Sequence, residues 1–107
     1  MVAPGVDVVS TVPQALCGGS WFCVGDQPYS AASGTSFAVA QVAALAALIR
    51  SHSPGLSTYE LQFVIRASAQ PLPDDDTPGW AGAGRIRMRH ALDAILFKIG
   101  AAGVTRN

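Results

Sequence analysis

The sequence is poor in charge. Only 13% of its 107 residues are charged, against ~25% in a typical soluble domain, and the formal net charge is zero. A nucleic-acid-binding protein needs a net-basic patch for the phosphates, so we expect no nucleic-acid partner. The one basic cluster, Arg85, Arg87 and Arg89 with His90, is typical of a solvated surface. Because 50% of the residues are hydrophobic, we expect the chain to form the interior of something larger.

Leader, metal and redox signals are also scarce. Residues 1–5 lack a basic region followed by a hydrophobic core, so we expect no signal peptide in this chain. The run Asp74-Asp75-Asp76 lacks the alternating oxygen ligands and glycine pivot of a calcium loop, so we expect neither a metal site nor a cofactor. Cys17 and Cys23 fit neither a zinc knuckle nor a redox pair. A local disulfide, which would imply an oxidising compartment, and two free thiols both remain open.

The longest apolar stretch runs from Phe37 to Ile49, and Gln41 is its only polar residue. Alanine and leucine dominate it, which predicts a helix that starts close to Ser36 and ends within residues 50–52. A helix that is apolar on every face is typical of a protein interior, so we expect it to be buried. At ~1.5 Å per residue its apolar part is roughly 20 Å long, short of the ~30 Å of a bilayer core, so we expect no membrane span.

Ser36 lies at the predicted beginning of this helix, after Gly34 and Thr35. The first backbone N–H groups of a helix have no partner within it, and the helix dipole makes that end positive. A hydroxyl there lies where an oxyanion would be stabilised, and Gly34 permits close approach of the backbone. On this stretch alone, however, the commoner role of Ser36 or Thr35 is a simple N-cap.

Two further patterns flank this helix. Residues 6–10 alternate and are rich in β-branched side chains, which predicts a strand, and residues 27–31 are expected to return as the second strand of a hairpin. Ser57 and Glu60 have the spacing of a capping box, which predicts a second helix to about Ala69. The expected apolar side of that helix carries Leu61, Val64, Ile65 and Ser68. Residues 70–84 are expected to form a surface loop, followed by a last helix over residues 89–99 and a disordered tail over residues 100–107.

Three pieces, in this order and spacing, resemble the C-terminal part of a subtilisin-like serine peptidase. They are Ala3-Pro4-Gly5-Val6 followed by Val8-Val9-Ser10-Thr11, then Ser33-Gly34-Thr35-Ser36 before an alanine-rich helix, and finally Gly82-Ala83-Gly84-Arg85-Ile86 before a last helix. The resemblance covers about residues 2–95. The chain departs from the family's pattern after the serine, where Ala40 and Gln41 stand in place of a proline and a histidine.

The resemblance implies an α/β, subtilisin-like fold, of which residues 1–107 would be the C-terminal portion of the catalytic domain: a β-hairpin, a buried serine helix and two further helices. It implies a serine-type endopeptidase that acts on protein or peptide substrates, with an extracellular parent. By the same resemblance Ser36 would be the nucleophile, and Gly34 and Thr35 would lie in the substrate and oxyanion region.

The other catalytic groups of such an enzyme, an Asp, a His and an oxyanion Asn, precede the serine in the family. Residues 1–35 contain no His and no Asn, and Asp7 and Asp26 match no family motif. His52 would lie more than ~20 Å from Ser36 at the far end of the helix, and His90 opens the last helix, so we expect both to be surface or capping residues.

We therefore expect the chain to supply the nucleophile segment and to be inactive without the missing N-terminal part of the domain. Two other interpretations remain open. The chain can be a fragment that complements a separate partner chain carrying the Asp and His. It can also be a non-catalytic helical interaction module.

Overall fold

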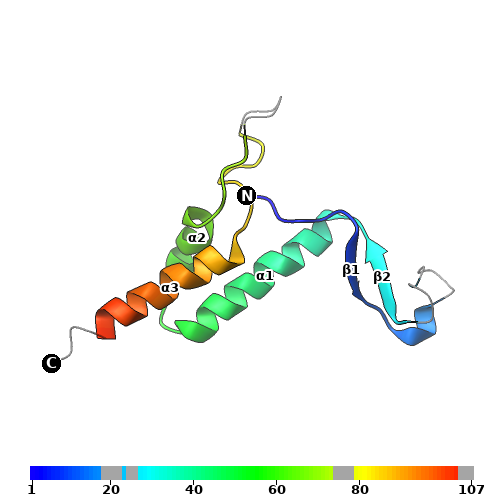
Figure 1. Cartoon of the computed structure of the whole chain (residues 1–107), viewed down its shortest axis with the longest axis horizontal. Helices are drawn as coiled ribbons and strands as arrows, with labels where there is room; N and C mark the ends of the chain where they lie inside the picture. The colour runs from blue at the N-terminus through cyan, green and yellow to red at the C-terminus, as the bar shows by residue number, and fades with distance from the viewer. Residues whose placement is uncertain (18–22, 24–26, 74–78, 104–107) are drawn as a thin grey trace. The chain divides into compact units, whose positions relative to one another are not determined.

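The structure of the protein is a computed structural model that describes residues 1–17, 23, 27–73 and 79–103. In these residues the chain forms two strands, a short 3-10 helix and three α-helices (Figure 1), so the α/β class predicted from the sequence is confirmed. The chain divides into two compact units, which are Pro4–Ala40 and a second unit of Met1–Ala3 with Gln41–Asn107.

The Pro4–Ala40 unit contains the hairpin. Strand β1 (Val8–Thr11) pairs antiparallel with β2 (Tyr29–Ala32), with Val8 opposite Ala32 and Thr11 opposite Tyr29. Both strands begin two residues later than predicted. Asp7 adopts a left-handed backbone conformation with φ of 50°, which cannot continue a strand. At the other side, the Tyr29 N–H donates to the Gln27 carbonyl over 2.8 Å, so residues 27–28 form a turn.

The excursion between the strands includes the 3-10 helix η1 (Gln14–Leu16) and the two cysteines. Cys17 and Cys23 are joined by a disulfide, with their Cα atoms 5.4 Å apart. Of the two states that the sequence leaves open, the structure therefore contains the bonded one, and no free cysteine occurs in the part of the chain that it describes. Cys23 also forms an isolated antiparallel bridge with Ser30 of β2, which ties the excursion to the sheet.

The second unit packs helices around a small apolar core. Helix α1 (Thr35–His52) matches the predicted start and end, and it is followed by α2 (Thr58–Ala67) and α3 (Met88–Gly103). Among the described residues, the core consists of Leu45 and Ile49 from α1, Ile65 from α2, and Ala91 and Ile95 from α3. Leu45 and Ile49 are one turn apart, so they lie on one face of α1.

The prediction that α1 is buried on every face is wrong for this chain. Only Leu45 and Ile49 of its residues are buried, whereas the side chains of Val39 and Leu48 are 64% and 44% exposed. The physical reason is that too few segments pack against α1 to cover all of its faces. In the core cluster of the described residues, α1 packs against α2, α3 and Leu56, which together cover one side of the helix.

The capping box predicted at the beginning of α2 is present. The Glu60 N–H donates to Ser57 Oγ over 3.2 Å, and Glu60 Oε2 accepts from the Ser57 N–H over 2.8 Å. The four residues predicted for the inner side, Leu61, Val64, Ile65 and Ser68, are all buried or half-buried, and Ala69 is half-buried as well. The helix ends at Ala67, two residues before the predicted end, because Gln70 already pairs with Arg85 through two backbone hydrogen bonds of 2.8 Å.

Arg85 lies between two segments that are distant in the sequence. It forms a parallel bridge with Val2 and an antiparallel bridge with Gln70. Gly84, beside it, has φ of 104°, and a Cβ at that position would overlap the Gln70 carbonyl, so the close approach of these two segments depends on a glycine there.

Helix α3 begins at Met88 and runs to Gly103, four residues beyond the predicted end. Of the tail predicted to be disordered, residues 104–107 lie outside the described residues, as do Asp74, Asp75 and Asp76. No helix in the described part of the chain has both the length and the apolar character that crossing a membrane requires.

Candidate functional site

Ser36 is the second residue of α1, and its side chain is exposed to solvent. The first hydrogen bond of this turn runs from the Phe37 N–H to the Gly34 carbonyl, over 3.1 Å. The N–H groups of Thr35 and Ser36 precede it and have no acceptor within the residues that the structure describes. Unpaired amides at a helix N-terminus attract negative charge, so an anionic oxygen beside Ser36 would meet two donors and the positive end of the dipole.

The Ser36 hydroxyl has no hydrogen-bond partner in the described part of the chain. An N-cap hydroxyl would accept a bond from an N–H two or three residues further along the helix. Neither Thr35 nor Ser36 makes such a bond among the described residues, and both already lie inside α1. The hydroxyl of Ser36 is thus available to react or to bind, whereas the simple N-cap finds no support in the geometry.

Two contacts from the segment before β1 hold the turn that precedes Ser36. The Gly34 N–H donates to the Gly5 carbonyl over 2.7 Å, and the Asp7 N–H donates to Ser33 Oγ over 2.9 Å. A Cβ on Gly5 would lie 3.0 Å from the Gly34 carbonyl oxygen and 3.4 Å from the Ala38 Cβ, so a larger residue would require the Gly34 backbone to shift by a few tenths of an ångström. All five residues belong to the Pro4–Ala40 unit.

Sequence reasoning missed Gly5, Asp7 and Ser33 as supports of the site. The residue types of Gly5 and Asp7 weakly indicate such a role. Glycine permits close backbone contact, and aspartate tolerates a left-handed conformation better than most residues. Nothing in the residue pattern indicates that Ser33, 26 positions away from Asp7, is the partner of the Asp7 N–H.

Neither histidine lies in the Pro4–Ala40 unit that contains Ser36. His52 is the last residue of α1, and its Nδ1 atom lies 3.0 Å from the Leu48 carbonyl, one of the last carbonyls of that helix. This is a capping contact of the kind that basic side chains make at helix C-termini. His90 is exposed in the first turn of α3. Asp7, the described carboxylate of the Pro4–Ala40 unit, faces Ser33 rather than a histidine.

Within the described residues, no three His, Cys, Asp or Glu side chains lie close enough together to hold a metal ion. The site therefore consists of one hydroxyl, two unpaired amides and the glycine turn that presents them. Such a set can attack an electrophilic carbon and hold the resulting oxyanion, provided that a base accepts the hydroxyl proton.

A sequence model of the Subtilase family matches residues 1–85 of the chain. A search of curated proteins finds Bacillopeptidase F of Bacillus subtilis (strain 168), which is 30% identical over 105 residues. That match covers 94% of this chain and 6% of the relative, so the chain spans a small part of that protein's length. Because the family match takes in residues 1–85, which include both the Ser36 turn and the segment that supports it, the chain belongs to the Subtilase family.

Proposed function

We propose that this chain supplies the nucleophile segment of a serine-type endopeptidase, with Ser36 as the nucleophile. One observation carries the proposal: in a Subtilase chain, Ser36 is exposed in the first turn of α1 and its hydroxyl has no structural hydrogen bond among the described residues. The chemistry would be attack of Ser36 Oγ on a peptide carbonyl, followed by hydrolysis of the acyl-enzyme.

The oxyanion region would be the turn formed by Gly34 and Thr35. The tetrahedral intermediate carries a negative charge on the former carbonyl oxygen, and the unpaired N–H groups of the first turn are suitable donors to it. A side chain at Gly34 would obstruct the substrate where it has to approach the backbone most closely. Substrates would be proteins or peptides.

The base must come from another part of the enzyme. A serine hydroxyl is a poor nucleophile at neutral pH unless a positioned base takes its proton. Both histidines of the sequence lie outside the unit that contains Ser36, and residues 1–35 include no histidine. The catalytic Asp and His would then belong to a preceding part of the peptidase domain, and the chain by itself would not hydrolyse peptides.

A fluorophosphonate probe, which labels activated serines covalently, tests this assignment. The 107-residue chain alone is expected to stay unlabelled. Mixed with a polypeptide that carries the Asp and His segments of a Subtilase domain, it is expected to be labelled at Ser36, and S36A is expected to abolish the label. Labelling at a different serine, or none in the mixture, would refute the assignment of Ser36. Stoichiometric labelling of the chain alone would refute the claim that it lacks a base.

The nucleotide sequence upstream of the Met1 codon separates the two ways in which the base could be supplied. An in-frame continuation that encodes the Asp and His motifs would make the chain one part of a longer peptidase. A separate neighbouring gene with those motifs would favour complementation by a partner chain. Absence of both would favour a non-catalytic helical module.

We also propose an extracellular location for the parent enzyme. The Cys17–Cys23 disulfide supports it, because disulfides form and persist mainly in oxidising compartments. Mass spectrometry of the natural protein, alkylated before reduction, would contradict this proposal if both cysteines carried the alkyl group.

A further inference from the structure

A shallow groove lies between α2 and α3 in the second unit. It consists of two hollows with volumes of about 340 and 270 Å³. The first lies along α2 and is lined by Tyr59, Gln62, Phe63, Arg66 and Ala67. The second lies between the helices, and its lining includes Phe63, Val64, Ala67, His90, Ala94 and Ile95. Because Phe63 and Ala67 line both, the hollows adjoin each other, and together they are called the α2–α3 groove below.

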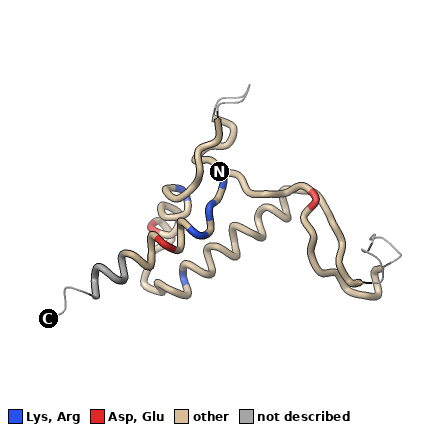
Figure 2. Tube along the Cα trace, in the orientation of Figure 1, with Lys and Arg blue, Asp and Glu red and all other residues tan. Residues whose placement is uncertain are grey.

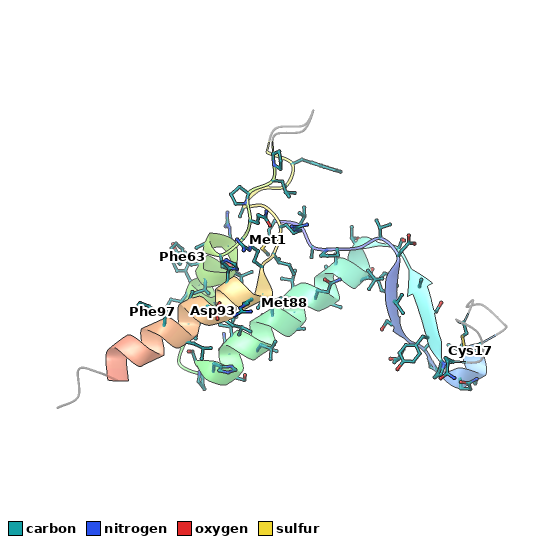
Figure 3. All side chains as sticks on the ribbon, viewed as in Figure 1. Met1, Cys17, Phe63, Met88, Asp93 and Phe97 are labelled. Carbon is teal, nitrogen blue, oxygen red and sulfur yellow. A yellow bond between two sulfur atoms is a disulfide. The ribbon has the colours of Figure 1, made fainter. Side chains whose placement is uncertain are left out.

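The groove is apolar and exposes large side chains. Phe63 is 62% exposed and Tyr59 is 78% exposed on α2. Phe97 of α3 lines neither hollow, but it is also exposed, by 79%. Figure 3 shows Phe63 and Phe97 projecting from their helices away from the core. Burying one such side chain completely is worth about 1.5–3 kcal/mol, so a partner that covered these residues would gain a substantial driving force.

One side chain with a full formal charge lines the groove. It is Arg66, in the first hollow, whereas Figure 2 shows both basic and acidic positions elsewhere on this unit. The carboxylates that α2 and α3 contribute have other partners, because Glu60 caps α2 and Asp93 lies 3.6 Å from Arg89. Within the described residues, the Arg66 guanidinium pairs with no carboxylate.

From these observations we propose that the α2–α3 groove is the docking site for an acidic amphipathic helix of another polypeptide. Two apolar side chains of that helix, one turn apart, fill the two hollows, in the manner of other helix-in-groove interfaces. A Glu or Asp beside them accepts charge-assisted hydrogen bonds from Arg66. A second copy of this chain is the alternative occupant, and the test below distinguishes it. This proposal does not depend on the role of Ser36.

The test uses the 107-residue chain, labelled with ¹⁵N, and two synthetic helical peptides. Both peptides carry leucines four residues apart, and they differ only in having Glu or Gln at the flanking positions. The Glu peptide is expected to shift the amide signals of Phe63, Ala67 and Ala94. It is expected to bind up to about fivefold more tightly than the Gln peptide, which is the upper end for an exposed ion pair, and to lose that advantage at high salt.

Two variants locate the charge effect. R66Q is expected to weaken binding of the Glu peptide to the level of the Gln peptide and to leave the Gln peptide unaffected. R50Q removes an equally exposed arginine at the end of α1 and is expected to change neither affinity. Both residues are exposed, so neither variant should unfold the chain.

Three results would overturn the proposal. The first is failure of the Glu peptide to bind at all. The second is equal binding of both peptides, or amide shifts confined to other residues, because recognition would then not use Arg66 and the groove. The third is concentration-dependent self-association that F63S abolishes, since the groove would then be occupied by a second copy of the chain.

Discussion

The Asp7 N–H donates to Ser33 Oγ over 2.9 Å, and the same hydroxyl lies 3.4 Å from Asp7 Oδ1, to which it donates in turn. The two residues are 26 positions apart, Asp7 immediately before β1 and Ser33 immediately before the turn that leads into α1. The first of the two bonds is well within hydrogen-bonding distance and the second is at its long limit. Through this pair, the backbone before the hairpin determines where the Ser36 turn begins.

S33A removes both contacts and is expected to loosen that turn. Because an exposed hydrogen bond contributes about 0.5–1.5 kcal/mol, the Pro4–Ala40 unit should lose stability in that range. The direct measurement is hydrogen exchange at the Asp7 amide, which should accelerate in S33A. S10A is a matched control, since Ser10 is exposed in β1 and its side chain makes no hydrogen bond among the described residues. Unchanged protection of the Asp7 amide in S33A would show that the pair does not hold the turn.

G5A is expected to displace the serine turn by steric pressure. Its new Cβ would lie 3.0 Å from the Gly34 carbonyl oxygen, closer than ordinary contact, and overpacking of this kind costs about 1–3 kcal/mol. G55A is the control, because a Cβ there meets nothing within 4 Å. It should be neutral, or should stabilise the chain by up to about 1 kcal/mol through the unfolded state. Urea unfolding measures both variants, and equal stabilities would contradict the predicted contact.

The parts of the fold that residue patterns predicted well are local. The Ser57–Glu60 capping box, the start of α1 and the apolar side of α2 each depend on residues a few positions apart, and each is present. The strand starts were predicted two residues early. The left-handed Asp7 makes a long-range contact with Ser33, and the turn at residues 27–28 is a short backbone contact that strand periodicity does not reveal.

The parts that could not be predicted are long-range. Arg85 pairs with both Val2 and Gln70, and Ser33 pairs with Asp7, across separations that leave no periodic signal in the sequence. The apolar composition of α1 predicted burial on all sides, yet composition specifies only that a helix should be covered and not which segments cover it. Ser36 was identified as the candidate nucleophile from the resemblance to the family, since the turn alone favours an N-cap, and its exposure follows from the fold.

S57A tests the predicted capping box. The variant loses the acceptor for the Glu60 N–H, and loss of an N-cap serine costs about 0.5–2 kcal/mol. E60Q should cost less than S57A, since glutamine can still accept from the Ser57 N–H in a capping box. Circular dichroism at 222 nm during thermal unfolding gives the order of stability. If E60Q proved as unstable as S57A, the charge of Glu60 rather than the reciprocal bonds would stabilise the beginning of α2.

G84A is expected to be the most destabilising glycine substitution in the second unit. Gly84 combines a φ of 104° with a Cβ position that would overlap the Gln70 carbonyl, so alanine there would break the Gln70–Arg85 pair. G79A separates the two causes, because Gly79 has a φ of 82° with open space around it. It should cost only the left-handed penalty of about 1–2 kcal/mol. Equal losses in the two variants, measured by urea unfolding, would indicate that the overlap relaxes without cost.

S36A should separate function from stability. The Ser36 hydroxyl is exposed and makes no hydrogen bond among the described residues, so its removal leaves no polar group unpaired. Alanine is also the better helix former, by roughly 0.5 kcal/mol, so the unfolding free energy should stay the same or rise slightly. Urea unfolding of S36A beside the parent chain measures this difference, with the destabilised S33A as the contrast. A serine that is kept for its reactivity does not need to stabilise the fold. If S36A lowered the unfolding free energy by more than about 1 kcal/mol, Ser36 would instead be a structural residue of the α1 turn.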